Sequence, residues 1–338
     1  MEVGAPPHAA YADAILAELE ARAGGFTGPL DSIYLGGGTP SIWEDADVAR
    51  VIAAVIARWG TPREVTIEAN PTDCLPARLD AWRAAGIDRI SIGVQSLAAE
   101  ELVTLGRDHR HGDGLAALER VLGHGGFRTS ADFILGTPGS AHGLDWISRV
   151  AATGVDHLSV YELTIEDRTA FGKRVRDGRL VPLDEQALAD LYEGAHAALG
   201  GAGFEHYEIS SYARPGRRAI HNSRYWTGAA YLGLGVGAAS LELLPGGDAI
   251  RATNPRRWTA YARGAAAEIT QVPAGEMATD RLWLGMRTSD GVEEGALGDL
   301  GAAFVTEGLA ERRGGRICPT LRGFLMADTI AARIVQAR

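Results

Sequence analysis

The chain has 338 residues, of which 46% are hydrophobic and 22% charged, an ordinary globular balance that excludes a disordered or fibrous protein. Its net charge is −10, and only one of its 33 basic residues is a lysine, Lys173. An acidic chain disfavours non-specific binding of nucleic acid or of an anionic membrane. The sequence shows no apolar stretch long enough to span a bilayer and no signal-peptide pattern. We therefore expect a cytoplasmic protein, with peripheral membrane association left open.

The chain contains two cysteines, Cys74 and Cys318, which stand far apart in the sequence. Two thiols are too few for a disulfide framework, for a four-cysteine zinc site, or for an iron–sulfur cluster ligated by this chain alone. The sequence therefore predicts no metal site built from its own cysteines.

Short β-rich runs recur at intervals of roughly 25–35 residues, with helical patterns between them. The runs are Ser32–Leu35, Val65–Ala69, Arg89–Val94, Thr129–Leu135 and His157–Leu163. The helical patterns include Val48–Trp59, Ala77–Ala85 and Gly112–Leu122. Alternation of strands with helices is typical of βα units, so we predict an α/β fold with a parallel barrel or open sheet.

An amphipathic helix is predicted at Ala9–Arg22, before the first visible strand. In a βα series such a helix follows a strand, yet no strand pattern precedes it. Either the architecture begins with a helix, or a strand upstream is missing. In the second case Ser32–Leu35 becomes an exposed edge of the sheet, which is a liability for a parallel apolar strand.

The pattern changes after Leu163. A helix is predicted at Asp184–Leu199, a β-like run at Glu205–Ser211, and a glycine-rich aromatic stretch at Tyr225–Ser240 that covers the open side of the barrel. Leu244–Asp248 predicts a hairpin turn. We divide the chain into a barrel (residues 1–175), a connecting region over the barrel (176–276) and a C-terminal module (277–338).

The C-terminal module begins near Ala278 with three predicted helices. The turn Arg312–Arg316 and a final helix at Leu321–Gln336 follow, a pattern typical of a winged-helix module. Arginines at such a turn could contact DNA. In an acidic protein they more often form a solvated turn, so we expect no nucleic-acid partner.

Three glycines, Gly36, Gly37 and Gly38, follow the first strand directly and precede Thr39 and Pro40. Glycines let the backbone approach a ligand closely and direct N–H groups at carboxylate or phosphate oxygens. The alternative is a tight strand-to-helix turn with no ligand.

Polar side chains also occur on the next strands. Glu68 lies next to the end of the second run. It could accept hydrogen bonds from ribose hydroxyls or an ammonium group, or it could cap a helix or form a salt bridge. Gln95 and Asp132 are polar residues on otherwise apolar strands, and Arg107 could supply a guanidinium to a carboxylate. Because parallel strands end at one rim, we expect these side chains to gather there.

His221 opens the segment HNSRYW, in which aromatic residues follow closely. Histidine can ligate iron, and aromatic rings can pack against a flat macrocycle. The alternative is a packed, hydrogen-bonded loop histidine.

Taken together, these motifs resemble one family. LGGGTPS, TIEANP, RISIGVQS, LGRDH, DFILGTPG, LSVYELTIE, YEISSYARPGRRAIHNSRYW and GLGVGAAS appear in this order. The set resembles the HemW branch of the radical S-adenosylmethionine proteins related to oxygen-independent coproporphyrinogen III oxidase. The resemblance implies a partial six-stranded (β/α) barrel with a C-terminal helical domain, in which the five visible strands would be the second to the sixth.

The resemblance also implies roles. Gly37, Gly38, Thr39 and Glu68 would bind S-adenosylmethionine, and Gln95, Arg107 and Asp132 match polar positions that line the same site. HNxxYW is characteristic of the heme-binding branch, which makes His221 the candidate heme contact. The family holds a [4Fe-4S] cluster through a CxxxCxxC loop after its first strand, and this sequence has no such motif.

Two explanations account for the missing cysteines: Met1 is a misassigned or internal start, or the gene encodes a variant without cluster chemistry. Under both, we expect no cluster ligands, no catalytic residues and no radical catalysis from the chain as given. The resemblance favours a heme chaperone that delivers heme to respiratory proteins. The alternatives are oxygen-independent oxidative decarboxylation of coproporphyrinogen III, and a barrel scaffold that has lost both functions.

Overall fold

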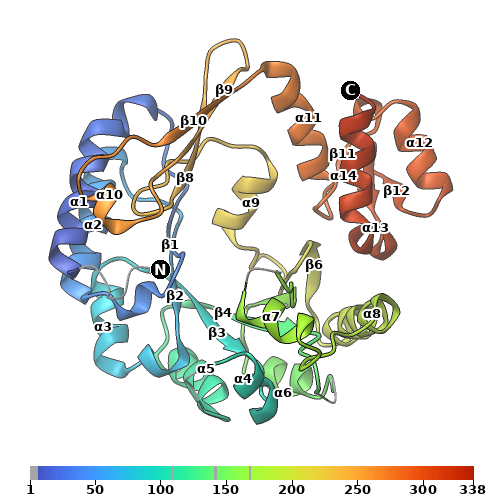
Figure 1. Ribbon diagram of the computed structural model, residues 1–338, viewed down its shortest axis with the longest axis horizontal. Coiled ribbons are helices and arrows are strands. Elements are labelled where there is room, and N and C mark those ends of the chain that lie inside the picture. Colours follow the sequence, from blue (N-terminus) through green and yellow to red (C-terminus); the bar gives the residue numbers. More distant parts are fainter. Residues whose placement is uncertain (1–6, 108–109, 141–142, 167–168) are drawn as a thin grey trace.

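The computed structural model describes residues 7–107, 110–140, 143–166 and 169–338. Its central element is one curled sheet of seven strands in the order β1-β2-β3-β4-β5-β7-β6 (Figure 1). The strands are β1 Ser32–Leu35, β2 Glu64–Ala69, β3 Arg89–Gln95, β4 Arg128–Leu135, β5 His157–Glu162, β6 Glu205–Glu208 and β7 Ser211–Ala213. β1 to β5 are parallel neighbours, whereas β7 is antiparallel to β5 and to β6. The predicted α/β fold is confirmed as a partial barrel, and one predicted run divides into β6 and β7.

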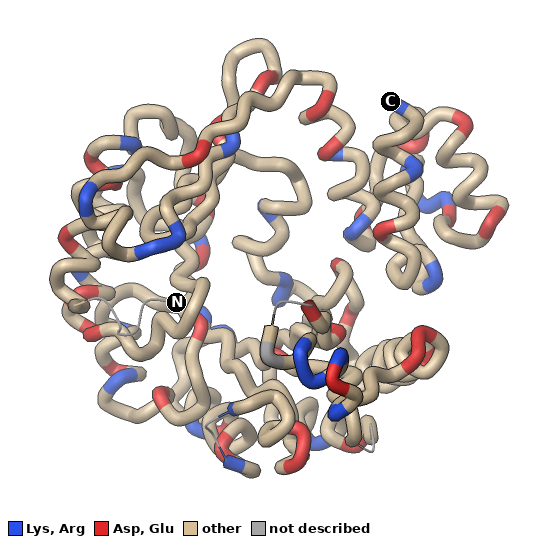
Figure 2. Tube along the Cα trace, in the orientation of Figure 1, with Lys and Arg blue, Asp and Glu red and all other residues tan. Residues whose placement is uncertain are grey.

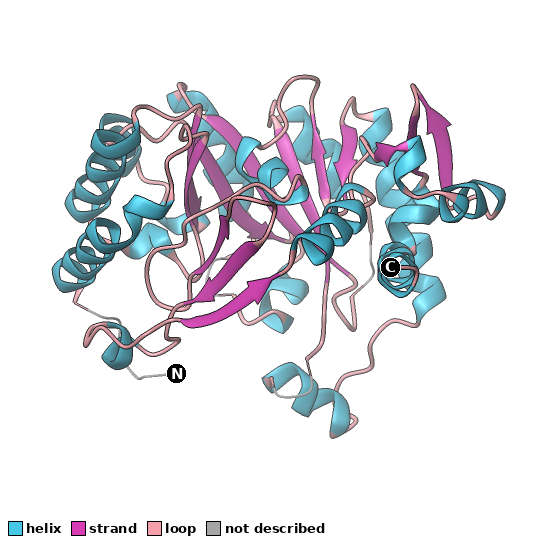
Figure 3. Ribbon diagram, turned by 90° about the horizontal axis from the view of Figure 1, so that it is seen from above, coloured by secondary structure: helices cyan, strands magenta, loops and turns pink. Residues whose placement is uncertain are grey.

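Most helices cover the outer face of the curled sheet, as Figures 1 and 3 show. The helices of this part are α1 His8–Arg22, α2 Asp45–Trp59, α3 Pro76–Ala84, α4 Ala99–Thr104, α5 Asp113–His124, α6 Trp146–Ala152, α7 Ala170–Arg176 and α8 Glu185–Gly201. Their ends follow local chemistry. Asp184 caps α8 by accepting a hydrogen bond from the Ala187 N–H at 2.8 Å, and α2 ends at Gly60 with φ 86°.

Alternation along β2 to β5 gives the sheet an apolar outer face and a polar inner face. Outward side chains such as Ile67, Ile92 and Leu158 are fully buried in the main hydrophobic core beneath the helices. The inward side chains are Glu64, Thr66, Glu68, Arg89, Ser91, Ser130, Asp132, His157, Ser159 and Tyr161. An interior lined by polar side chains suits a hydrophilic ligand better than an interior filled with close-packed apolar side chains does.

β1 lies at one edge of the sheet, because β2 is its only strand partner within the described ranges. Ser32–Leu35 thus occupies one edge of the described sheet. The chain then folds back across this edge: α9 Ile220–Trp226 contacts β1, and the segment after it leads into a second sheet.

The second sheet has three antiparallel strands in the order β10-β9-β8, namely β8 Ala239–Leu243, β9 Ala249–Thr253 and β10 Glu268–Val272. The predicted hairpin turn at Leu244–Asp248 joins β8 to β9 and is therefore confirmed. α10 Trp258–Tyr261 lies between β9 and β10. β10 has no alternating apolar pattern, since four of its five residues are exposed, so its pairing could not be predicted.

The C-terminal elements form a unit with a hydrophobic cluster of its own. They are α11 Ala274–Gly285, β11 Val292–Glu293, α12 Asp299–Thr306, β12 Ala310–Arg313, β13 Arg316–Pro319, α13 Leu321–Leu325 and α14 Ala327–Gln336. The three strands pair in the order β11-β13-β12 around the Gly314–Gly315 turn. The prediction of three helices before this turn is wrong: two α-helices and a short 3-10 turn stand there. The predicted last helix is interrupted at Met326.

The arginines of the β12–β13 turn lie beside acidic partners. Arg312 pairs with Glu294 at 2.6 Å, Arg313 lies 3.5 Å from Glu311, and Arg316 pairs with Glu293. Figure 2 shows acidic and basic positions interspersed over the C-terminal elements. This turn is therefore neutralised locally and is not an isolated basic patch.

Two features concern the chain as a whole. None of the helices in the described ranges has the length and apolar character needed to cross a bilayer. The main sheet extends past residue 175, because β7 pairs with β5. The boundaries at residues 175 and 276 stay predictions.

Candidate functional site

The glycine loop after β1, residues 36–38, has open space beside two of its three glycines. Gly37 and Gly38 have φ values of 78° and 112°, and a side chain added at either would meet no atom within 4 Å. Both positions therefore require glycine for the backbone conformation, and both leave room for a ligand. Thr39 ends the loop and leads into the 3-10 turn Pro40–Ile42.

Glu68 lies directly beside this loop. Its carboxylate accepts hydrogen bonds from the Tyr34 hydroxyl at 2.5 Å and from the Gly37 N–H at 3.3 Å. Burial, followed by the charge of Glu68, raises the pKa of Tyr34 well above its usual range, so the hydroxyl remains a donor. Glu68 thus links the glycine loop to Tyr34 on the inner face of β1. This role differs from both the helix cap and the salt bridge considered above.

Asp132 lies in the middle of β4, inside the half-barrel, and not at the strand end. It accepts hydrogen bonds from Ser91 at 3.1 and 3.0 Å. Burial raises the pKa of its carboxyl from 3.8 to about 6, while hydrogen bonds from Ser159 and Ser91 oppose the rise and the charge of Glu68 adds to it.

Asp132→Asn tests this effect on stability. Because the folded state holds the proton more tightly than the unfolded chain does, the wild-type free energy of unfolding falls as pH rises between about 4 and about 6. Asparagine carries no charge, so we expect the variant to be about 1–2 kcal/mol more stable than wild type at pH 7.5 and no more stable at pH 4. Urea unfolding at both pH values measures the difference. If the variant gained the same free energy of unfolding at both pH values, the result would contradict a raised pKa at Asp132.

Gln95 and Arg107 behave differently from one another. Gln95 ends β3 with φ 65°, and it is the one non-glycine residue with positive φ in the described part of the chain. Such strain in a non-glycine residue clusters at functional sites. Arg107 follows α4 with an exposed side chain, and among the described residues no contact joins it to Glu68 or Asp132. The structure thus brings Glu68, Asp132 and the glycine loop together and leaves Arg107 apart.

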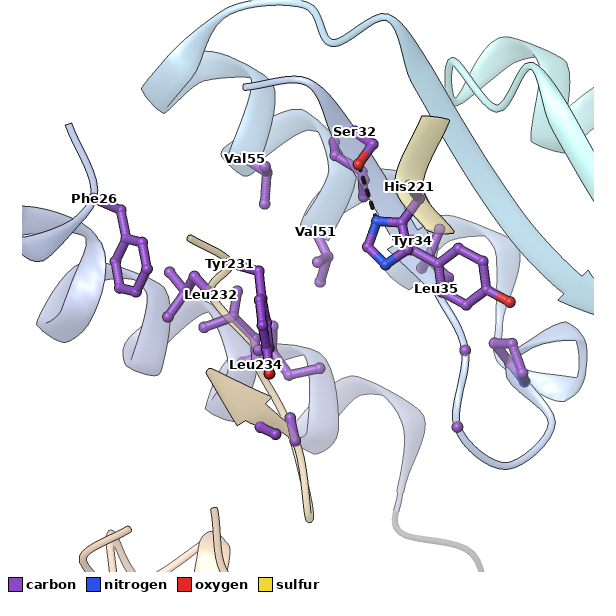
Figure 4. A pocket seen from close by; sticks show the side chains of 18 of the residues that line it. Phe26, Ser32, Tyr34, Leu35, Val51, Val55, His221, Tyr231, Leu232 and Leu234 are labelled. Carbon is purple, nitrogen blue, oxygen red and sulfur yellow. Dashed lines mark hydrogen bonds between the residues drawn. The ribbon is translucent and has the colours of Figure 1, made fainter. Parts of the chain in front are cut away.

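His221 lies next to Tyr34, at the free edge of β1 (Figure 4). Its ring stacks on the Tyr34 ring with centroids 4.5 Å apart and planes inclined by 16°. Nδ1 is hydrogen-bonded to the Ser32 hydroxyl at 2.9 Å, and Nε2 lies 3.2 Å from the Tyr225 hydroxyl. Burial lowers the pKa of His221 to about 4, so the imidazole is neutral at pH 7.

Helix α9 holds this histidine in place through Glu64. The buried Glu64 carboxylate accepts hydrogen bonds from the backbone N–H groups of Ile220 at 3.0 Å and His221 at 2.9 Å. Arg128 lies 3.2 Å from the same carboxylate. A strand of the barrel therefore fixes the first turn of α9.

A cavity of about 1550 Å³ runs along the free edge of β1, larger than the ~300–1,000 Å³ typical of small-molecule sites. Its walls are mainly apolar and come from β1, α1, α2 and the segment after α9. The lining includes Phe26, Leu35, Val51, Val55, Leu232, Leu234, His221 and Tyr225. The glycine loop reaches the same cavity through Gly36, Gly37 and Thr39.

The cysteines do not contribute to this site. Cys74 is buried in the main core, and burial raises the pKa of its thiol to about 12, whereas Cys318 is buried in β13. A [4Fe-4S] cluster needs several cysteine thiolates grouped around it, whereas these two buried thiols lie in separate parts of the fold, Cys74 in the main core and Cys318 in β13. Within the described ranges, no three His, Cys, Asp or Glu side chains are arranged to hold a metal ion. These residues do not fit a [4Fe-4S] cluster.

Sequence reasoning missed Tyr34, Ser32 and Glu64. All three lie on strands at alternate positions that face inward, in the series Ser32, Tyr34 and Glu64, Thr66, Glu68. Reading the polar face of each strand with a period of two would have found them.

Comparison with known proteins agrees with this architecture. Residues 5–142 match the radical SAM superfamily. The heme chaperone HemW of Mycobacterium tuberculosis is 34% identical over 335 residues, covering 95% of this chain and 85% of its own. HemW of Escherichia coli is 34% identical over 266 residues, covering 77% and 69%.

Among solved structures, coproporphyrinogen III oxidase (HemN) of Escherichia coli, a radical SAM enzyme, superposes with a TM-score of 0.78 at 22% identity. The superposition covers 98% of this chain and 84% of that one, and it supports the fold. The extent of the match to the mycobacterial relative decides the family. The chain belongs to the HemW family of the radical SAM superfamily.

Proposed function

We propose that the protein is a heme chaperone that binds heme through His221 and delivers it to respiratory proteins. One observation carries the proposal: a neutral, oriented histidine lies at the wall of a large apolar cavity in a chain of the HemW family. The cargo would be a flat apolar macrocycle, for which walls such as Val51, Val55 and Leu232 are suitable partners.

The contacts of His221 suit an iron ligand. A metal-binding histidine usually donates its second ring N–H to a fixed acceptor, which sets the tautomer. The Ser32 hydroxyl at 2.9 Å from Nδ1 can accept that proton and leave the lone pair on Nε2. In the described part of the chain, Nε2 contacts the Tyr225 hydroxyl at 3.2 Å, a contact that iron would replace.

We also propose that the rim binds S-adenosylmethionine. Gly37, Gly38 and Thr39 would face the ligand through the open loop, and Glu68 would accept hydrogen bonds from hydroxyl or ammonium groups. Gln95 and Asp132 complete the inner wall, and Arg107 is the member with least structural support. S-adenosylmethionine would supply a positively charged sulfonium next to these carboxylates.

His221→Ala tests the heme site. We expect the variant to fold, to bind hemin at least about tenfold more weakly than wild type, and to give a shifted Soret band, because the axial ligand is lost. Optical titration with hemin measures both quantities.

The matched control is His124→Ala, which removes an exposed histidine on α5 and should leave the hemin spectrum unchanged. An unchanged spectrum in His221→Ala would refute the proposed ligand. Conversion of coproporphyrinogen III by the wild-type preparation would instead favour oxidative decarboxylation, the alternative that the HemN-like fold suggests.

A further inference from the structure

The two proposed sites share one side chain, Tyr34. Its hydroxyl donates to Glu68 Oε1 at 2.5 Å, and the face of its ring stacks on the His221 imidazole with the ring centroids 4.5 Å apart. Glu68 Oε2 in turn accepts the Gly37 N–H at 3.3 Å. A continuous set of contacts therefore runs from the glycine loop to the imidazole.

The backbone of β1 is adapted to this arrangement. Ser32 and Tyr34 are same-face neighbours on β1, and both contact His221. A Cβ at Gly36, the next position on that face, would lie 2.3 Å from the Tyr34 ring and 2.9 Å from Glu68 Oε1. Glycine is required there because the tyrosine ring and the carboxylate occupy the space above it.

We propose that Tyr34 is a positioning residue that couples the two sites, so that a nucleoside ligand held by Glu68 strengthens heme binding at His221. The inference rests on the proposed function. It concerns how occupancy of the rim regulates the heme site.

The physical basis lies in the lone pairs of Glu68. An ionised carboxylate has about four acceptor positions, of which Tyr34 and Gly37 use two. Hydroxyl donors of a nucleoside can take the others without displacing Tyr34. The carboxylate then becomes fixed, and Tyr34 loses conformational freedom. Its ring in turn fixes the orientation of the His221 imidazole, which would ligate the iron. Part of the ordering cost of heme binding is thereby met in advance, which is positive coupling.

Hemin titrations with and without saturating S-adenosylhomocysteine test the coupling. In the wild type we expect S-adenosylhomocysteine to lower the hemin Kd about fivefold or more. The reciprocal titration must give the same ratio, because coupling of two binding equilibria is symmetric. Both titrations use the wild-type protein, so this test stands even if a substitution disturbs folding.

Tyr34→Phe keeps the ring on His221 and removes the hydroxyl that reaches Glu68. We expect the ratio of the hemin Kd without S-adenosylhomocysteine to the Kd with it to fall to about one in this variant, whatever its affinity for hemin alone. Tyr231→Phe is the matched control: Tyr231 lines the same cavity and packs on Tyr225, so its ratio should remain that of the wild type.

A wild-type ratio of one, absent binding of S-adenosylhomocysteine, or an unchanged ratio in Tyr34→Phe overturns the coupling while leaving the proposed heme site intact. Absent hemin binding in the wild type overturns the proposed function and this inference with it. The two failures are therefore distinguishable.

Discussion

Glu64→Ala is expected to lower the free energy of unfolding by about 3–5 kcal/mol and to release helix α9 from the barrel. The Glu64 side chain is fully buried and accepts hydrogen bonds from two backbone N–H groups of α9 while lying 3.2 Å from Arg128. Alanine would leave both N–H groups without their acceptor and deprive Arg128 of one of its two carboxylates, the other being Asp88 at 2.7 Å. Urea unfolding measures the loss of stability.

Hydrogen exchange over residues 219–228 measures the release of α9 separately. Glu64→Gln retains one acceptor oxygen and should lose less stability than Glu64→Ala. Glu119→Ala removes an exposed carboxylate from α5 and should leave both measurements at their wild-type values. Slow exchange over α9 in Glu64→Ala would show that other contacts hold the helix.

The dependence of α9 on Glu64 explains which parts of the site could be predicted from the sequence. Strands β1 to β5 and helices α1, α2, α3, α5 and α8 follow from local patterns, since apolar periodicity and turn residues lie within each segment. The contact between Glu64 and α9 joins residues 156 and 157 positions apart. No local pattern encodes such a distance, so the support of His221 became visible only in the folded chain.

The rim shows the same distinction. Glu68 follows from its place at the end of a parallel strand, and the glycine loop follows from its composition. Asp132 was expected at the rim, but the strand continues for three residues beyond it, so its carboxyl lies deeper, next to Ser91. The sequence groups Arg107 with these residues because its guanidinium could pair with a carboxylate. Its exposed position after α4 depends on loop geometry that the strand pattern does not contain.

Gly233→Ala is expected to destabilise the protein by roughly 3 kcal/mol or more and to weaken hemin binding, because it displaces the wall of the cavity. A Cβ at Gly233 would lie 2.0 Å from the backbone oxygen of Ala239 in β8, and backbone cannot rotate away as a side chain can. The Gly233 carbonyl also accepts from Arg22 at 3.1 Å, and its N–H donates to Ser240 at 2.9 Å.

Displacement of Gly233 must therefore strain these contacts and shift Leu232 and Leu234, which line the cavity on either side of it. Gly200→Ala is the matched control, because a Cβ at this position near the end of α8 would meet nothing within 4 Å. Alanine there should leave stability unchanged or raise it by up to about 1 kcal/mol. Urea midpoints and hemin Kd values of both variants decide the matter. If Gly233→Ala matches Gly200→Ala in both, the segment after α9 does not form a fixed wall, and the cavity is not shaped in advance for its ligand.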